Sequence, residues 1–406
     1  MKTALVLSGG GARGAYEAGV MLYLREALPQ ALGLPPSEVR LDVVSGVSIG
    51  AVNACFLAST AHEPESQVRQ LADLWRSLNL EDVFRWSVVS LASVPSYVYG
   101  QLRSLKRRRV SWRLSDFLYP EALADVVRER IDWGRLHLNL DLGHLEALTV
   151  TATDLGTGRA VVFVESRQPL PPWSRDPLVE VRDGAIGPEH ALASGALPLL
   201  FRPVRIGDAW FSDGSIRQAT PIAPALRLGA DRILVVAMRY QGAAEAAPPE
   251  PGDEAPSTAS QLGRVLNALH LDRTDYDLDR LRRLNALLEQ GEQAFGPGFA
   301  ERINAVAMRT LGAPLRKVRY LVIRPSRDIG QIARRHAEAR ARRVRPGTLA
   351  SRLLRWAASG GEESQGGAAD LASYLLFDRG YAEELMALGY ADAEARRADV
   401  EAFFRE

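Results

Sequence analysis

The sequence predicts an α/β fold in which a mostly parallel central sheet is flanked by helices and followed by a mainly helical C-terminal extension. In the first 60 residues, short apolar runs alternate with stretches of helical spacing, the rhythm of a parallel sheet with helices on its faces. After about residue 240 the composition changes and helical patterns dominate. The 406 residues are 47% apolar and 24% charged, as in a soluble globular protein with room for a large domain and an appendage.

The first two strands are expected at 3–10 and 39–47, and a helix follows each of them. Residues 3–10, TALVLSGG, form a short apolar run that ends in glycines, as buried parallel strands do. Helical spacing follows at 14–28 and, after the second strand, at 49–60. The loops that leave these two strands therefore start at the same end of the sheet.

The remaining elements of the predicted sheet lie between residues 145 and 238. We expect two joined strands in 145–166, a short helix in 187–201, a hairpin in 204–215, a helix in 221–230 and a buried strand in 231–238. Gly156 to Gly158 and the pair Gly207-Asp208 supply the turns of the two hairpins.

The composition divides the chain into three segments. Residues 1–240 hold the predicted sheet. Residues 241–260 are rich in Pro, Ala and Glu and have almost nothing to bury, so we expect a flexible linker or loop there. Residues 261–406 form the helical extension, in which one strand at 318–325 is expected to rejoin the edge of the sheet.

Charge and cysteine content exclude several classes of function. The net charge of +1 gives no global attraction to nucleic acid or membrane, and we expect no nucleic-acid partner. The single cysteine, Cys55, excludes an intrachain disulfide and a multi-cysteine metal site. The apolar run after Lys2 is too short for a signal peptide, and no stretch approaches the ~20 apolar residues of a membrane span. The expected location is the cytoplasm, with or without peripheral membrane contact.

A serine nucleophile is predicted at Ser48. The Gly-x-Ser-x-Gly pattern occurs at Gly46-Val47-Ser48-Ile49-Gly50, at the predicted junction between a buried strand and a helix. Gly46 and Gly50 allow a sharp turn on either side of the serine, and the helix N-terminus places positive charge beside a developing oxyanion. A tight turn that simply needs small residues gives the same pattern without any chemistry.

The glycine-rich loop after the first strand has two interpretations. Gly9, Gly11 and Gly14 in GGGARG satisfy the dinucleotide fingerprint, which favours a nucleotide-binding oxidoreductase. That fingerprint needs an acidic residue near the end of the second strand, whereas Asp42 lies at its start. Backbone N–H groups at a helix N-terminus can instead stabilise an oxyanion, and the candidate residues are Gly9, Gly10, Gly11, Ala12, Arg13 and Gly14.

The base that activates the serine is sought among six histidines and one aspartate. Of the histidines, only His190 has a plausible context. Asp213 is the better candidate, because it follows an apolar strand and the adjacent Gly214 allows a tight turn that presents the carboxylate at the end of the sheet. An Asp-Gly hairpin turn without catalytic meaning is equally consistent with this spacing.

Four segments together resemble the patatin-like phospholipases: SGGGARG (8–14), GVSIG (46–50), ASGALPLLFRPV (193–204) and DGS (213–215). TATDLGTGRAVVF (151–163) also looks like the central hairpin of that family, so the resemblance covers about residues 2–240. It implies the three-layer patatin fold for this catalytic domain, and the C-terminal segment looks like that of longer bacterial members.

The resemblance also implies a chemistry. It implies hydrolysis of lipid or phospholipid esters by a Ser48–Asp213 dyad without a histidine, an oxyanion hole in the glycine loop, and neither a metal nor another cofactor. The family usually has Gly or Ala where this chain has Ser215, and because serine is small we expect the turn after Asp213 and Gly214 to survive. A catalytically idle lipid-binding scaffold is the remaining alternative, which the presence of nucleophile, base and glycine loop together disfavours.

A membrane-docking segment is expected at residues 84–114. Apolar and aromatic residues, including Trp86, precede six basic residues with no acidic residue among them, and Arg107, Arg108 and Arg109 are consecutive. Such a segment suits docking on anionic lipid headgroups. A cap over the sheet that ends in a solvated run of charges is the alternative.

Overall fold

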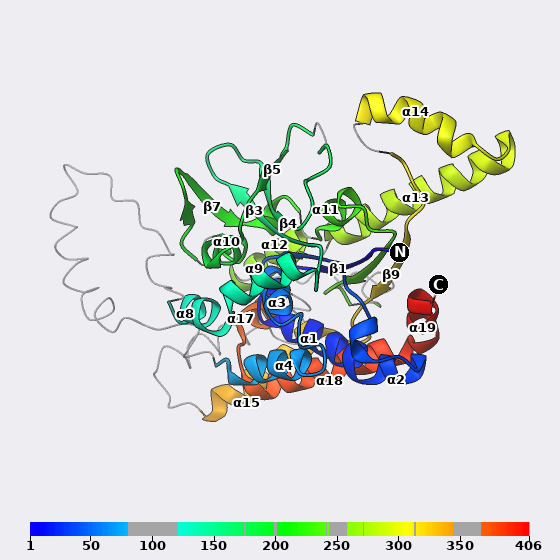
Figure 1. Cartoon of the computed structure of the whole chain (residues 1–406). Coiled ribbons are helices and arrows are strands. Elements are labelled where there is room, and N and C mark those ends of the chain that lie inside the picture. Colours follow the sequence, from blue (N-terminus) through cyan, green and yellow to red (C-terminus); the bar gives the residue numbers. More distant parts are fainter. Residues whose placement is uncertain are drawn as a thin grey trace, which may run out of the picture.

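The computed structural model describes residues 1–79, 121–173, 176–198, 201–218, 220–240, 242, 258–270, 272–311, 314–343 and 367–405. These residues form a nine-stranded sheet with the order β5-β4-β3-β2-β1-β8-β9, and the β6–β7 hairpin pairs with β3 (Figure 1). The strands are β1 (Thr3–Leu7), β2 (Val43–Val47), β3 (Ala147–Asp154), β4 (Ala160–Ser166), β5 (Val179–Asp183), β6 (Val204–Ile206), β7 (Ala209–Asp213), β8 (Arg232–Val236) and β9 (Arg319–Ile323).

The sheet is mostly parallel, which confirms the predicted fold class. β3, β2, β1, β8 and β9 are parallel neighbours, whereas β4 and β7 pair with β3 in the antiparallel sense. Every residue of β1, β2 and β8 is buried. Strands covered on both faces need such continuous apolar runs, and that is the pattern by which the sequence predicts them.

Helices cover both faces of the sheet. The helical elements up to β8 are η1 (Gly11–Gly14), α1 (Ala15–Leu22), the π-helical turn η2 (Tyr23–Ala27), α2 (Leu28–Leu32), η3 (Pro36–Glu38), α3 (Ile49–Ser59), α4 (Gln67–Ser77), α8 (Glu121–Arg130), α9 (Trp133–Leu142), α10 (Pro188–Ser194), η5 (Gly214–Ile216) and α11 (Ile222–Arg227). Leu5 and Leu7 of β1 face a core shared with α1 and α3. Ala4 and Val6 of the same strand face a second core shared with α11 and α13 (Asp272–Phe295). The result is a three-layer arrangement.

The C-terminal helices join the same core as the N-terminal ones. They are α12 (Thr258–His270), α13, α14 (Phe299–Leu311), α15 (Ile329–Arg343), α17 (Gly367–Leu375), α18 (Arg379–Ala395) and α19 (Arg397–Arg405). α18 lies along α1 (Figure 1), and glycines allow the close approach, since a Cβ atom on Gly389 would lie 2.2 Å from the carbonyl oxygen of Tyr16. The Tyr16 hydroxyl donates to Asp392 Oδ2 at 3.0 Å, which ties the two helices together.

Several expectations fall on parts of the chain that the structure does not describe. Trp86, Arg107, Arg108 and Arg109 lie outside the described residues, as do residues 243–257 of the expected linker. α12 already begins at Thr258. Among the described helices, none combines the length and the apolar character needed to cross a lipid bilayer.

The register of the sheet places three loops at one edge. Leu7, the last residue of β1, pairs with Gly46 of β2, and Val47 pairs with Thr151 of β3. Asp213, the last residue of β7, pairs with Ala152 of β3. The glycine loop, the Ser48 turn and the turn after Asp213 therefore leave neighbouring strands close to one another.

Candidate active site

Ser48 occupies a strained turn between β2 and α3. Its φ of 54° lies in the left-handed region that favours glycine, with a ψ of −130°, and it is the one non-glycine residue with positive φ in the described part of the chain. Such a conformation costs about 1–3 kcal/mol and persists only where the surroundings impose it. The neighbouring glycines are required by packing, since a Cβ atom would lie 2.4 Å from Gly50 O at Gly46 and 2.5 Å from Leu7 O at Gly50.

The hydroxyl of Ser48 is paired with the carboxylate of Asp213. Ser48 Oγ donates to Asp213 Oδ2 at 2.6 Å, a distance typical of a charge-assisted O–H···O⁻ bond. Both residues are buried, with relative exposures of 2% and 0%. Asp213 Oδ1 accepts from Ser215 N at 2.8 Å, and Asp213 N donates to Ala196 O at 2.9 Å. The carboxylate is thus held on both sides with one oxygen directed at the serine.

The turn after Asp213 forms with a serine at its third position. A Cβ atom on Gly214 would lie 2.1 Å from the carbonyl oxygen of Thr151, so this position requires glycine. Ser215 is fully buried in η5. Its hydroxyl makes no hydrogen bond within the described residues, so the side chain fits the turn by its small size.

Ser194 also belongs to the site, and the sequence analysis missed it. The backbone N–H of Ser48 donates to Ser194 Oγ at 2.8 Å, and Ser194 Oγ donates to Thr151 O at 2.7 Å. This hydroxyl therefore fixes the backbone of the strained turn against β3. Ser194 lies within the segment 193–204 that carries the family resemblance, but its spacing from Ser48 gives no sign of the contact.

The glycine loop lies beside Ser48. Gly9 and Gly10 follow β1, and Gly11 begins the turn η1 with a φ of 57°. The first N–H groups of a helical turn lack intrahelical partners, and Gly11 lines the same cavity as Ser48. The backbone N–H of Arg13 is engaged within the loop, because it donates to Gly10 O at 3.2 Å.

Buried polar groups hold the far end of this loop. Asn53 Nδ2 donates to Gly14 O at 3.1 Å and to Glu17 Oε2 at 2.7 Å, while Trp75 Nε1 donates to Asn53 Oδ1 at 3.1 Å. Glu17 is fully buried. Burial raises the pKa of the Glu17 carboxyl well above its ordinary value, and the hydrogen bonds from Asn53 and Ser8 only partly oppose this.

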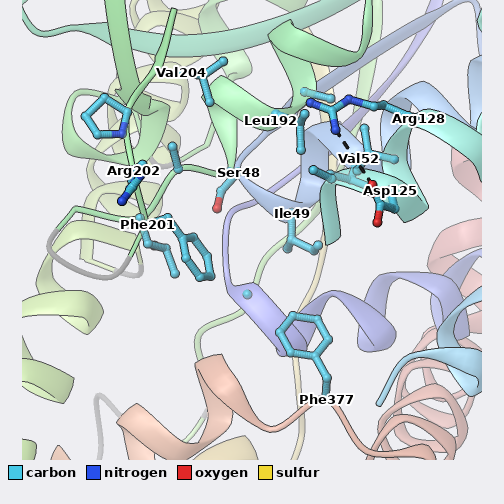
Figure 2. Close-up of a pocket in the computed structure, with 18 of the residues that line it drawn as sticks. Ser48, Ile49, Val52, Asp125, Arg128, Leu192, Phe201, Arg202, Val204 and Phe377 are labelled. Carbon is cyan, nitrogen blue, oxygen red and sulfur yellow. Dashed lines mark ion pairs between the residues drawn. The ribbon is translucent and has the colours of Figure 1, made fainter. Parts of the chain in front are cut away.

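A cavity of about 320 Å³ opens beside Ser48, a volume at the lower end of the range for ligand pockets. Its walls are mainly apolar, and they include Ile49, Val52, Leu192, Phe201, Val204 and Phe377 (Figure 2). Charged side chains line it on two sides: Arg202 lies beside Phe201, and on the other side Arg128 and Asp125 form an ion pair at 3.9 Å. The apolar wall beside the Ser48 hydroxyl can accommodate a hydrocarbon chain.

A family model for patatin-like phospholipases matches residues 5–226. The chain belongs to the patatin-like phospholipase family. The match includes the glycine loop, Ser48 and Asp213, and membership supports activity as a lipid hydrolase. No protein in the curated collections matches the chain significantly.

Several solved structures are similar to this chain at low sequence identity. VipD from Legionella pneumophila is 14% identical with a TM-score of 0.31, and the match covers 95% of this chain and 66% of the VipD chain. Human GIVD cytosolic phospholipase A2, in complex with methyl gamma-linolenyl fluorophosphonate, is 13% identical with a TM-score of 0.42. That match covers 100% of this chain and 58% of the human chain. The ExoU–SpcU complex from Pseudomonas aeruginosa is 19% identical with a TM-score of 0.27, and the match covers 98% of this chain and 76% of the chain in that structure. This chain thus spans less than two thirds of the length of VipD and of the human phospholipase A2.

His190 does not line the cavity beside Ser48. Its Nδ1 accepts from Gly187 N at 2.9 Å at the start of α10, and its ring packs edge-on against Phe163 at 4.5 Å. It lines a different cavity, together with Arg182. Burial lowers the pKa of the His190 imidazole. The structure brings Asp213, not this histidine, to the serine.

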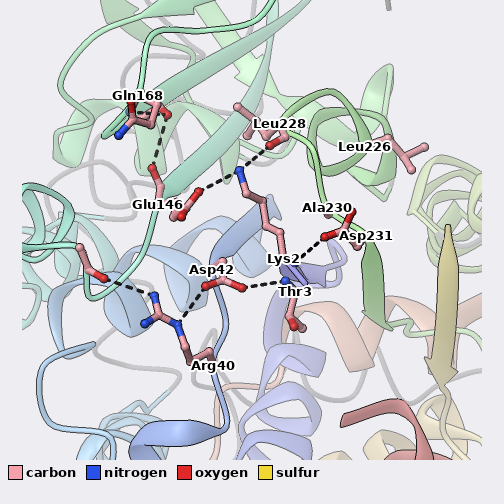
Figure 3. Close-up of polar contacts among 12 residues, drawn as sticks. Lys2, Thr3, Arg40, Asp42, Glu146, Gln168, Leu226, Leu228, Ala230 and Asp231 are labelled. Carbon is pink, nitrogen blue, oxygen red and sulfur yellow. Dashed lines mark hydrogen bonds and ion pairs between the residues drawn. The ribbon is translucent and has the colours of Figure 1, made fainter. Parts of the chain in front are cut away.

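Asp42, the acidic residue of the dinucleotide interpretation, lies at the other end of the sheet. It accepts from Thr3 N at 2.8 Å and pairs with Arg40 at 3.1 Å (Figure 3). It precedes β2, whereas the glycine loop and Ser48 follow β1 and β2. The carboxylate is therefore a full strand length from the loop that it would have to serve.

Proposed function

We propose that this protein is a lipid acyl hydrolase of the phospholipase A or lysophospholipase type, with Ser48 as nucleophile and Asp213 as base. The observation that carries the proposal is the 2.6 Å hydrogen bond from Ser48 Oγ to Asp213 Oδ2 beside an apolar cavity. Membership of the patatin-like phospholipase family supports the same chemistry.

The reaction is an acyl transfer in two steps. Ser48 Oγ attacks the ester carbonyl carbon while Asp213 takes its proton, and that proton then passes to the leaving alcohol as the ester C–O bond breaks. Water next attacks the acyl-enzyme, gives a proton to Asp213 and releases the fatty acid, and the proton returns to Ser48. The negative charge that develops on the carbonyl oxygen in both steps is stabilised by N–H groups of the glycine loop around Gly11.

A carboxylate is normally a weaker base than an imidazole by about 2.6 pKa units, or roughly 3.5 kcal/mol. Preorganisation offsets this difference in the proposed site. Asp213 is held by two neighbouring backbone groups and already accepts the proton to be transferred. A rigid oxyanion hole of fixed N–H groups supplies about 2.7–4 kcal/mol per donor whichever base is used.

The proposed substrate is a lipid ester with its acyl chain in the apolar cavity. Ile49, Val52 and Phe377 line the cavity beside Ser48. A hydrocarbon chain bound there would gain about 25 cal/mol of binding free energy for each Å² of apolar surface that is removed from water. Docking of residues 84–114 on anionic lipid, through Trp86 and Arg107 to Arg109, remains part of the proposal, as does the division into a catalytic domain, a linker and a helical extension.

Covalent labelling with a fluorophosphonate tests the proposal, because the reagent modifies only an activated serine. We expect the full-length protein to be labelled once, at Ser48, and the Ser48→Ala variant to be neither labelled nor active on nitrophenyl esters and phospholipid. Ser59→Ala is the matched control, since Ser59 is equally buried and its hydroxyl donates to Phe56 O within α3. An unlabelled wild-type protein would instead indicate an idle scaffold.

A further inference from the structure

Arg13 of the glycine loop is a buried cation whose side chain enters the C-terminal half of the protein. The guanidinium is 3% exposed. Its Nε donates to Ser373 Oγ at 2.7 Å, and its Nη2 lies 3.2 Å from both Asp370 Oδ1 and Asn267 Oδ1. The charge is thus neutralised by a carboxylate 357 residues further along the chain.

α17 contacts the glycine loop at a second point. The guanidinium carbon of Arg13 lies 4.3 Å from the centre of the Tyr374 ring. The backbone of Tyr374 presses against Gly11, where a Cβ atom would lie 2.4 Å from Tyr374 O. Tyr374 OH in turn donates to Asn267 Oδ1 at 3.0 Å. The loop is therefore held on its backbone and through a side chain by the same helix.

The start of the glycine loop has an anchor of its own. Ser8 Oγ lies 3.1 Å from Thr220 Oγ1, and Thr220 is hydrogen-bonded to Thr274 at the beginning of α13. The segment between Ser8 and Arg13 is thus suspended between two buried attachments to C-terminal helices. Its N–H groups depend on those attachments for their direction.

The end of α17 also reaches the cavity. Tyr374 and Phe377 line it together with Ser48, and Phe377 faces it from the side opposite Val204 (Figure 2). Phe377 is stacked on Trp75 with ring centres 6.3 Å apart. A helix far along the chain therefore contributes both a wall of the cavity and the support of the loop next to the nucleophile.

We propose that Asp370 is a positioning residue of the active site, which acts through Arg13 to hold the glycine loop in the orientation that presents its N–H groups to the oxyanion. The inference rests on the proposed function, since it assigns α17 to the machinery of that same reaction. Asp370 touches neither Ser48 nor the cavity. Its effect is on the transition state, because the loop N–H groups matter most when negative charge develops.

Asp370→Asn in the full-length protein tests the inference. A misplacement of about 1 Å in a catalytic group costs up to about 100-fold in rate, so we expect kcat on a soluble nitrophenyl ester to fall about 10–100-fold while KM stays unchanged. The rate of fluorophosphonate labelling falls in parallel. Ser373→Ala, which removes one hydrogen bond from Arg13, gives a smaller loss in the same direction, and it serves if Asp370→Asn does not fold.

A double-mutant cycle tests whether Asp370 acts through Arg13. If Asp370 acts through Arg13, the losses of kcat in Arg13→Gln and Asp370→Asn are not additive, and Asp370→Asn has little further effect in the Arg13→Gln background. Asp399→Asn is the matched control, because it breaks the exposed ion pair between Asp399 of α19 and Arg396 at the end of α18 and should leave kcat unchanged.

Two outcomes overturn the inference alone. One is a folded Asp370→Asn protein with wild-type kcat and wild-type labelling rate. The other is a cycle in which the two losses simply add, as expected if Asp370 affects the rate independently of Arg13. A wild-type protein that is not labelled and hydrolyses no ester overturns the proposed function, and the inference falls with it.

Discussion

The Ser194→Ala substitution removes the hydroxyl that holds the backbone of Ser48, the proposed nucleophile. Ser194 Oγ accepts from Ser48 N at 2.8 Å and donates to Thr151 O at 2.7 Å. The substitution leaves the Ser48 N–H and the Thr151 carbonyl unpaired at that contact, in a region where Ser194 and Thr151 are 0% exposed. The change in volume is small, so the lost hydrogen bonds dominate the effect.

The expected cost follows from these two groups. A buried polar group left without a partner costs about 1–3 kcal/mol, so the two together lower the free energy of unfolding by about 2–6 kcal/mol. Ser48 is also less firmly held in its left-handed conformation, which itself costs about 1–3 kcal/mol. We therefore expect kcat to fall by about tenfold or more, equivalent to at least ~1.4 kcal/mol of lost transition-state stabilisation.

Urea unfolding and initial rates on a nitrophenyl ester measure the two effects separately. Ser59→Ala is the matched control, because it also deletes a buried serine hydroxyl but leaves Phe56 O paired with Thr60 N. If Ser194→Ala has the stability and the rate of Ser59→Ala, the hydroxyl does not hold the turn and the reasoning is refuted.

Three further predictions concern other features. Gly214→Ala should abolish turnover, because its Cβ atom would lie 2.1 Å from Thr151 O and would displace the adjacent Asp213. Gly134→Ala is the control and should be as active as the wild type, because the atom nearest to its added Cβ is 3.6 Å away. Burial raises the pKa of the Glu17 carboxyl in the folded protein. The stability contributed by its neutral form is therefore fully present below the unfolded pKa of about 4.3 and is lost as the pH rises toward the folded pKa. In urea unfolding, Glu17→Gln should gain stability relative to the wild type between about pH 4 and pH 7, and an equal difference at both pH values would contradict this. Replacing Arg107, Arg108 and Arg109 by Gln should weaken co-sedimentation with anionic vesicles in a salt-dependent way and leave soluble-ester turnover intact; unchanged co-sedimentation would mean a solvated surface run.

Strands buried on both faces were predictable because their composition admits only one interpretation. β1 and β8 are unbroken apolar runs bounded by glycine or polar turns, and they lie where the pattern predicts. β5 was not predicted: Val179–Asp183 has the alternation of apolar and charged residues that a half-exposed edge strand shows, but the run is only five residues long. The predicted strand at 39–47 begins later, at Val43, because the carbonyl of Val39 accepts instead from the buried side chain of Arg25.

The candidate site was predictable only where local sequence determines geometry. Gly46 and Gly50 mark the Ser48 turn because no other residue fits there. The pairing of Ser48 with Asp213 spans 165 residues, and spacing alone could not decide between Asp213 as the base and a simple Asp-Gly hairpin turn. The contacts of Ser194 with Ser48 and of Asp370 with Arg13 are set by how the layers pack, and no periodicity in one sequence encodes them.

The most direct test of the central claim compares the initial rates of Ser48→Ala, Asp213→Asn and His190→Ala on one soluble ester. We predict that Asp213→Asn is about as inactive as Ser48→Ala and that combining the two causes no further loss, because nucleophile and base act as one unit. His190→Ala should keep most of its activity, since its imidazole caps α10 and packs on Phe163. An inactive His190→Ala together with an active Asp213→Asn would contradict the account and indicate a serine–histidine enzyme instead.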